Sequence, residues 1–89
     1  MKPTIGRIVI YCPTKAEQEL FNNFQTKCPA IIVSVWSDTC VNLKVLHDGI
    51  YDRWKTSINK FDPSIKIPGT DLPSIENTWD WPVIEKINK

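Results

Sequence analysis

Two alternating runs in the middle of the chain carry most of the side chains that could hold a ligand. Arg53, Lys55 and Ser57 alternate along one run, and Asn42 and Lys44 alternate along the run before it. Alternate residues of an extended strand share a face, so each run would present its cations and polar groups together. Guanidinium and ammonium groups form strong charge-assisted hydrogen bonds with phosphate. The mixture therefore predicts a site for a phosphate-bearing ligand.

The four tryptophans supply the flat surfaces that a nucleotide base would need. Stacking a base on an aromatic side chain stabilises the complex by about 1–3 kcal/mol. Trp79 and Trp81 are one residue apart, so in an extended segment they share a face, with Asp80 on the other. They would wall the ligand site together with Trp36, close the core, or anchor a protein interface, where tryptophan is enriched.

Trp54 is the exception among the tryptophans. It shares a face with Thr56, opposite Arg53 and Lys55, so in a single subunit it is expected in the core, and only an oligomeric site would use both faces. The set expected to contact the ligand is Trp36, Asn42, Lys44, Arg53, Lys55, Thr56, Ser57, Trp79 and Trp81. An ordinary solvated sheet face has the same alternation, and the residues alone favour that interpretation.

Catalytic and metal-binding patterns are missing from the sequence. The single histidine, His47, precedes an Asp-Gly turn and is expected to be solvated, and Cys40 has no base placed beside it. No glycine-rich phosphate loop occurs. The three cysteines lack CxxC spacing, which predicts reduced, unliganded thiols in a reducing compartment. We therefore expect neither an enzyme nor a cofactor or metal.

The length and the net charge of the chain restrict the classes of partner that it is expected to bind. The 89 residues predict one domain, 1–89, whose small core would gain from homo-oligomerisation. Eleven basic and ten acidic residues nearly cancel, which argues against general binding of nucleic acid. No apolar run is long enough for a signal peptide or a membrane span.

The elements that position these residues are short strands and one helix. Strands are expected at 6–11, 30–36, 41–46, 51–58 and 78–81, with Val41, Leu43 and Val45 facing inward. Thr14 and Glu17 form a capping-box pattern that starts a helix over about 15–25, which Cys28 and Pro29 would close. The apolar face of this helix would consist of Ala16, Leu20, Phe21 and Phe24.

Residues 59–77, broken by prolines, predict an extended loop or arm, and 83–89 a polar tail with slight helical character. An arm of this length would be able to reach a neighbouring copy. The elements together predict a mainly β fold, a small SH3-like or OB-like antiparallel barrel with one inserted helix.

Three ordered segments resemble a group of small tailed-phage proteins. The segments are VWSDTCVNLKV at 35–45, RWKTSI at 53–58 and TWDWP at 78–82, and the group pairs VWSDTCVNLxV with TSV and a closing GTWHWP. Asn77 stands where the group has glycine, Asp80 where it has histidine, and Ile58 where it has valine. The arm is also longer than in the group, so loop geometry differs more than the fold.

The resemblance implies a phage protein that acts in the host bacterial cytoplasm. It further implies overlap with phage nucleotide sponges of the anti-CBASS type, which sequester cyclic dinucleotide immune signals without cleaving them. Such a protein needs affinity and no catalytic residues. The alternative is a non-catalytic protein-interaction or virion accessory module that uses its tryptophan patch.

Overall fold

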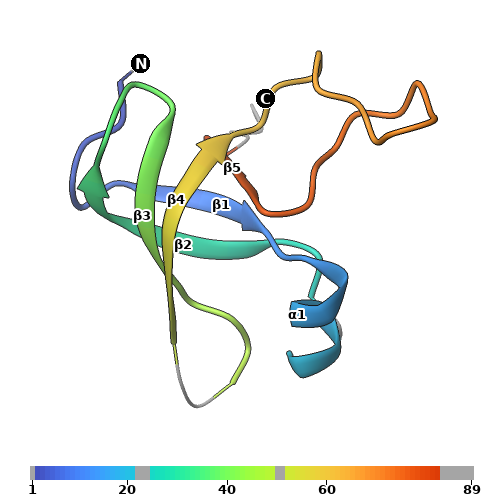
Figure 1. Cartoon of the computed structure of the whole chain (residues 1–89). Coiled ribbons are helices and arrows are strands. Elements are labelled where there is room, and N and C mark those ends of the chain that lie inside the picture. The colour runs from blue at the N-terminus through green and yellow to red at the C-terminus, as the bar shows by residue number, and fades with distance from the viewer. Residues whose placement is uncertain (1, 22–24, 50–51, 83–89) are drawn as a thin grey trace, which may run out of the picture.

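Five strands of the chain close into a small barrel, which confirms the predicted mainly β fold (Figure 1). The computed structural model describes residues 2–21, 25–49 and 52–82. In chain order the elements are β1 (Ile8–Cys12), α1 (Lys15–Leu20), β2 (Cys28–Val35), β3 (Cys40–Val45), β4 (Arg53–Lys60) and β5 (Thr78–Asp80). The predicted tail at 83–89 lies outside the described residues.

The strands follow one another around the barrel in chain order, and β5 closes it against β1. This meander differs from the Greek-key order of an OB-fold, so it agrees with the SH3-like expectation. One pairing departs from the antiparallel prediction, because β5 runs parallel to β4, with Asn59 opposite Thr78 and Lys60 opposite Trp79. Residues 61–77 therefore leave β4 and return beside it.

The core is built from alternate residues of all five strands. Each of these side chains is at most 2% exposed, as expected for the inner face of a closed sheet. The inward placement of Val41, Leu43 and Val45 is confirmed. The strand residues of the core are Val9, Tyr11, Cys28, Ala30, Ile32, Val41, Leu43, Val45, Ile58 and Trp79.

Strand β3 is flanked by an extra residue on each side. Ile32 pairs with Leu43 and Ser34 pairs with Asn42, so Val33 has no partner in β3. On the other side, Thr56 and Ser57 both lie opposite Asn42, between the pairs that Val41 and Leu43 make. Ser57 has φ 55, in the left-handed region. Two bulges thus meet at Asn42 and bend the sheet there.

Helix α1 is shorter than predicted and turned to another face. Thr14 caps it through the predicted capping box, but the helix ends at Leu20, and Phe21 is extended with φ −88 and ψ 146. Pro13, Glu17 and Phe21, spaced at i, i+4 and i+8, are buried, whereas Ala16 is exposed and Leu20 is 70% exposed.

The predicted apolar face of α1 was therefore wrong for Ala16 and Leu20 and right for Phe21. The physical reason is that the capping carboxylate of Glu17 pairs with Arg53 and Lys55 of β4, which turns the helix face that carries Glu17 toward the barrel. Phe24 lies outside the described residues.

Two strand boundaries also differ from the prediction. Cys28 and Pro29 open β2 instead of closing the helix, and the Pro29 carbonyl accepts a hydrogen bond from Leu46 N at 2.9 Å. Strand β4 continues to Lys60, past the predicted end at Ile58, because Lys60 N donates to Thr39 O at 2.8 Å. Residue Tyr51, its predicted start, lies outside the described residues.

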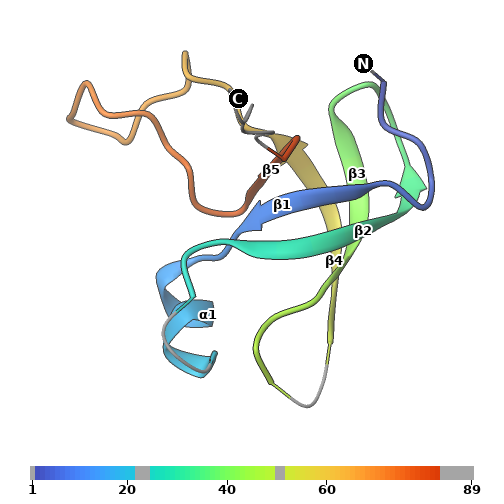
Figure 2. The same cartoon turned by 180° about the vertical axis from the view of Figure 1, so that it is seen from behind.

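The arm, defined here as residues 61–77, extends away from the barrel and from α1 in both views (Figures 1 and 2). A small ladder holds it: Ile67 N donates to Leu72 O and Ser74 N to Ile65 O, both at 2.9 Å. Gly69, with φ 81, lies in the turn at its tip. The arm returns at Asn77, whose N–H donates to Cys12 O at 2.7 Å.

Candidate functional site

The structure distributes the predicted ligand residues over three places. One group lies on the outer surface of β3 and β4, a second at the barrel end that α1 covers, and a third in and beside β5. We call the first group the outer face; it consists of Trp36, Asn42, Lys44, Trp54, Thr56 and Ser57.

Asn42 is the centre of the outer face. Asn42 is only 8% exposed. Its Oδ1 atom accepts three hydrogen bonds. The donors are Trp36 Nε1 at 2.8 Å, Ser57 N at 2.9 Å and Thr56 Oγ1 at 3.0 Å. Indole and backbone N–H groups can only donate, so they fix the orientation of the Asn42 amide.

This contact gives Trp36 an unusual combination of exposure and order. Trp36 is 64% exposed, yet its ring is tied to Asn42 through the indole nitrogen. A large, flat side chain held in one orientation loses little conformational entropy when something stacks on it. Trp36 is therefore suited to be a preorganised binding platform.

Trp54 and Lys44 complete the outer face. They pair across β3 and β4, Trp54 is 59% exposed, and Lys44 Nζ lies 3.9 Å from Asp52 Oδ2. The expectation that Trp54 is core in a single subunit was wrong, because Arg53 and Lys55 take the inner side of β4 at this end of the barrel. The outer face thus offers two exposed indoles and one cation.

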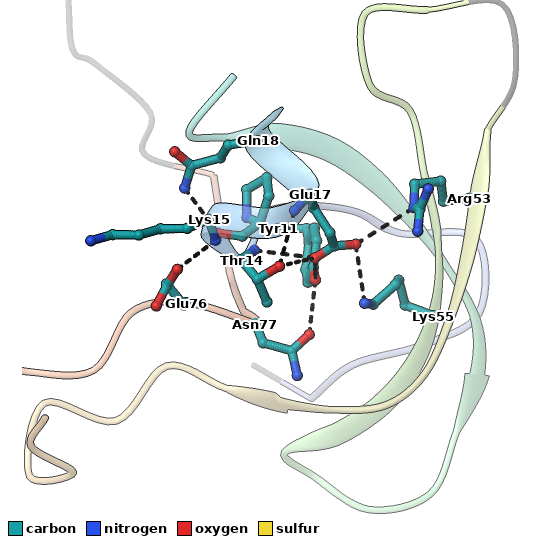
Figure 3. A network of polar contacts seen from close by, with 10 residues as sticks. Tyr11, Thr14, Lys15, Glu17, Gln18, Arg53, Lys55, Glu76 and Asn77 are labelled. Carbon is teal, nitrogen blue, oxygen red and sulfur yellow. Dashed lines mark hydrogen bonds and ion pairs between the residues drawn. The ribbon is translucent and has the colours of Figure 1, made fainter. Parts of the chain in front are cut away.

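The second group is a network around Glu17, whose side chain is only 7% exposed (Figure 3). Lys55 Nζ donates to Glu17 Oε2 at 3.1 Å, and Arg53 Nε lies 3.6 Å from the same oxygen. The Tyr11 hydroxyl donates to Oε1 at 2.6 Å, and Thr14 N donates to it at 3.1 Å. The carboxylate of α1 thereby closes this end of the barrel.

The electrostatics of the network favour a charged Glu17. Burial alone would raise the pKa of Glu17, but hydrogen bonds from Tyr11, Thr14 N–H and Lys55 outweigh it and lower this pKa below its ordinary value. Burial and the neighbouring carboxylate raise the pKa of Tyr11, so it stays a hydrogen-bond donor.

Arg53 and Lys55 both face the carboxylate of Glu17, and the hydrogen-bonding capacity of the Arg53 guanidinium is only partly satisfied among the described residues. In the described part of the chain, Arg53 Nε is buried without a hydrogen bond, and the guanidinium lies 5.9 Å from the Phe21 ring centroid. The His47 ring stacks on the Phe21 ring with the centroids 4.3 Å apart. Among the residues that the structure describes, His47 Nδ1 is also buried without a hydrogen-bond partner. His47 is thus packed rather than solvated, contrary to the prediction.

Arg53 and Lys55 do not join Lys44 in one site. They project toward Glu17 from the inner side of β4, whereas Lys44 pairs with Trp54 on the outer side. The sequence indicated which residues share a face but missed Glu17 as their partner. The signal was a capping glutamate on a helix that follows an aromatic strand residue, Tyr11, at a spacing that lets the two meet.

The third group packs at β5. Trp79 is fully buried and its Nε1 donates to Thr39 O at 2.9 Å. Trp81 meets it edge-on, with ring centroids 5.2 Å apart and an interplanar angle of 88°, and Arg7 lies over Trp81 at 5.3 Å. Trp79 therefore belongs to the core, while Trp81 is half-buried at its rim.

Two grooves border the arm, and sequence reasoning did not find them. One, of about 430 Å³, is largely apolar and is lined by Ile10, Cys12, Lys27, Phe61, Ile75, Asp80 and Trp81. We call it the β1–β5 groove. The other, of about 500 Å³, is lined by Thr39, Asn59, Lys60, Phe61, Asp62, Pro63 and Ile65.

The cysteines are unpaired in the structure. Cys28 is buried, and burial, with Glu17 nearby, raises its pKa to about 11, whereas Cys12 and Cys40 are partly exposed. Among residues 2–21, 25–49 and 52–82, no group of histidine, cysteine and carboxylate side chains is placed to hold a metal ion. Within the same residues no helix has the length and apolarity to cross a membrane.

Comparison of the chain with protein-family models, with curated proteins and with solved structures found no match.

Proposed function

We propose that this chain is a non-catalytic binding protein for a phosphate-bearing nucleotide signal of the cyclic dinucleotide type, used by a phage in the host cytoplasm to sequester it. The observation that carries the proposal is Trp36, which is 64% exposed, held by Asn42, and on the same face as a cation, Lys44. An aromatic platform beside a cation is the combination by which proteins hold a base and its phosphate.

The outer face matches this ligand in number as well as in kind. A cyclic dinucleotide carries two bases joined through phosphates, and the outer face carries two exposed indoles, Trp36 and Trp54, with Lys44 paired to Trp54. Stacking contributes about 1–3 kcal/mol for each base. Thr56, which is exposed, supplies a hydroxyl at the same surface.

The proposal moves the phosphate contact from Arg53 and Lys55 to Lys44. Arg53 and Lys55 are engaged with Glu17, so a ligand would have to compete with a buried carboxylate for them. The Lys44 side chain is 45% exposed, and in the described part of the chain its ion pair is with Asp52 at 3.9 Å, a distance at which an exposed ion pair contributes little.

A second function is favoured by the large exposed apolar side chains. Trp36, Trp54 and Leu72 are each more than half exposed, and surfaces of this kind commonly mark protein interfaces. The chain would then be a protein-interaction or virion accessory module, with Trp36 and Trp54 as anchors in a partner protein.

Calorimetry with a panel of cyclic and linear nucleotides tests the first function. We expect binding by the wild type and weaker binding by both variants. Lys44→Ala loses a phosphate contact of about 1.5–3 kcal/mol and should bind at least about tenfold more weakly. Trp36→Ala loses a stacking contact of about 1–3 kcal/mol and should bind at least about fivefold more weakly. Lys66→Ala, on the exposed arm, is the matched control and should bind like the wild type.

The result separates the two functions. If no nucleotide gives heat at micromolar concentration, the nucleotide proposal fails. If a host or virion protein is instead retained by the wild type and lost with Trp36→Ala and Trp54→Ala, the interaction module is the better description. A bound nucleotide should also raise the melting temperature, because it binds only the folded state.

A further inference from the structure

The arm exposes more apolar surface than its own structure can cover. Ile65, Ile67, Leu72 and Ile75 are 58%, 42%, 64% and 52% exposed. The ladder between 65–67 and 72–74 is a two-stranded piece with no buried core residue among the described residues of the arm. A two-stranded hairpin is marginally stable alone in water, so burying these apolar side chains against another protein surface would stabilise the arm.

Charge points to this same chain as the cover. The arm carries three carboxylates and one lysine, a net charge of −2. Because the whole chain is net +1, the remaining residues carry +3. Apart from Phe61 and Ile75, the residues that line the β1–β5 groove belong to that oppositely charged remainder. Its charged lining residues are Lys27 and Asp80, and Asp80 is already paired with Lys60 Nζ at 3.5 Å. An acidic, apolar arm and a largely apolar groove with a lysine are complementary.

The tip cannot fill the groove of its own subunit. Phe61 and Ile75, at the two ends of the arm, already form part of that groove, and the ladder carries Ile67 and Leu72 away from the barrel (Figures 1 and 2). Turning the arm back onto its own groove would bend it at its two ends, where Phe61 N donates to Trp79 O at 2.8 Å and Asn77 N donates to Cys12 O at 2.7 Å.

We propose that the arm tip, Ile67 and Leu72, docks into the β1–β5 groove of a second copy of this chain. The contact is reciprocal, so two arms and two grooves form a two-fold dimer, the commonest closed assembly of soluble proteins. Lys27 of each groove faces the acidic arm of the other copy. The dimer does not depend on nucleotide, because the groove lies apart from the outer face.

Light scattering over a concentration series tests the assembly. The wild type should have twice the 10.3 kDa mass of the chain at high concentration. Leu72→Asp places a charge in the docked tip and should weaken association at least tenfold. Ile5→Asp, at an apolar residue that is 71% exposed and outside the arm, is the matched control and should dimerise like the wild type. Far-UV circular dichroism checks that each variant is folded.

A cross-link tests the position of the tip. Cys12 lines the groove, so Leu72→Cys should form an intermolecular disulfide with Cys12 when diamide is added as the oxidant. The same variant with Cys12→Ser should lose that cross-link, whereas Cys40→Ser should keep it. A monomeric wild type, a Leu72→Asp dimer of unchanged affinity, or a cross-link that persists without Cys12 overturns the proposal.

Discussion

Glu17 is the residue through which α1 is attached to the barrel. The helix has only 6 residues, too few to be stable by its own hydrogen bonds. Its capping carboxylate accepts hydrogen bonds from β1 through Tyr11 and from β4 through Lys55. A single side chain thus caps the helix and joins three elements.

Replacing Glu17 by glutamine should therefore be costly. Glu17→Gln leaves Lys55 and Arg53 without their counter-charge, and we expect a loss of about 2–3 kcal/mol in the free energy of unfolding. This loss of stability is smaller than is usual when a buried ion pair is broken, because the side chains of Arg53 and Lys55 are partly exposed to solvent. Urea denaturation measures it, and Glu19→Gln, exposed on the same helix, should change stability little. Equal effects at both positions would contradict the role of Glu17.

The same carboxylate predicts a dependence of stability on pH. Because folding lowers the pKa of Glu17, its contribution is fully present above the ordinary glutamate pKa of about 4.3 and is lost as pH falls through the lower folded value. The free energy of unfolding should fall as the pH drops below about 4.3, and fall less in Glu17→Gln. Asp62, whose pKa the Ser64 hydroxyl and N–H lower, titrates in the same direction in both proteins and cancels from the difference.

Asn42 allows a comparison between two substitutions of similar size. Asn42→Leu removes the acceptor of three hydrogen bonds and should cost about 2–3 kcal/mol, since the Ser57 N–H is left without a partner. Asn42→Asp keeps an acceptor oxygen and should cost about half as much. The near-ultraviolet circular dichroism of Trp36 should weaken in Asn42→Leu alone. An unchanged signal there would mean that Asn42 does not orient the indole.

At the scale of the elements, the bulge in β4 is the feature that alternation could not reveal. Thr56 and Ser57 share one partner, and Ser57 adopts φ 55. A β-branched residue is strained at that φ, whereas glycine is not. Ser57→Val should therefore be less stable than Ser57→Gly by about 1–2 kcal/mol, as thermal unfolding can show. A more stable valine variant would exclude this conformation.

The strands were predictable because each has the period of two that a barrel wall requires, as in Val41, Leu43 and Val45. The face of α1 was not predictable from hydrophobicity, because its buried stripe contains a carboxylate, Glu17, held by cations distant in sequence. Long-range ion pairs leave no periodic trace in the chain. The bulges at Asn42 are invisible for a similar reason, since they depend on the pairing partners.

At the scale of the whole molecule, the predicted ligand residues of β3 and β4 lie on two opposite sides of the barrel wall. Alternation predicted correctly that Arg53 and Lys55 share a face opposite Trp54. It placed the wrong face inward, because at the barrel end that α1 closes the inner side of β4 carries the cations that pair with Glu17, and Trp54 lies on the outer side. The indole of Trp36 and the cation Lys44 were predicted as ligand residues and do lie on one surface.

The left-handed Asn77 ends the arm beside the point where the arm begins, since Asn59 and Thr78 are neighbours in the sheet. Because the two ends of the arm are adjacent, the arm can be lengthened without moving the barrel strands. Each doubling of its length costs only about 0.6 kcal/mol of loop-closure free energy. The return end must stay, because Glu76 accepts a hydrogen bond from Lys15 N at 2.6 Å. The turn at Gly69 has open space around it, since a Cβ atom there would have no neighbour within 4 Å. A short peptide tag inserted there should leave the far-UV circular dichroism of the folded chain unchanged while abolishing the proposed self-association, which makes the tip a permissive position for displaying a foreign sequence.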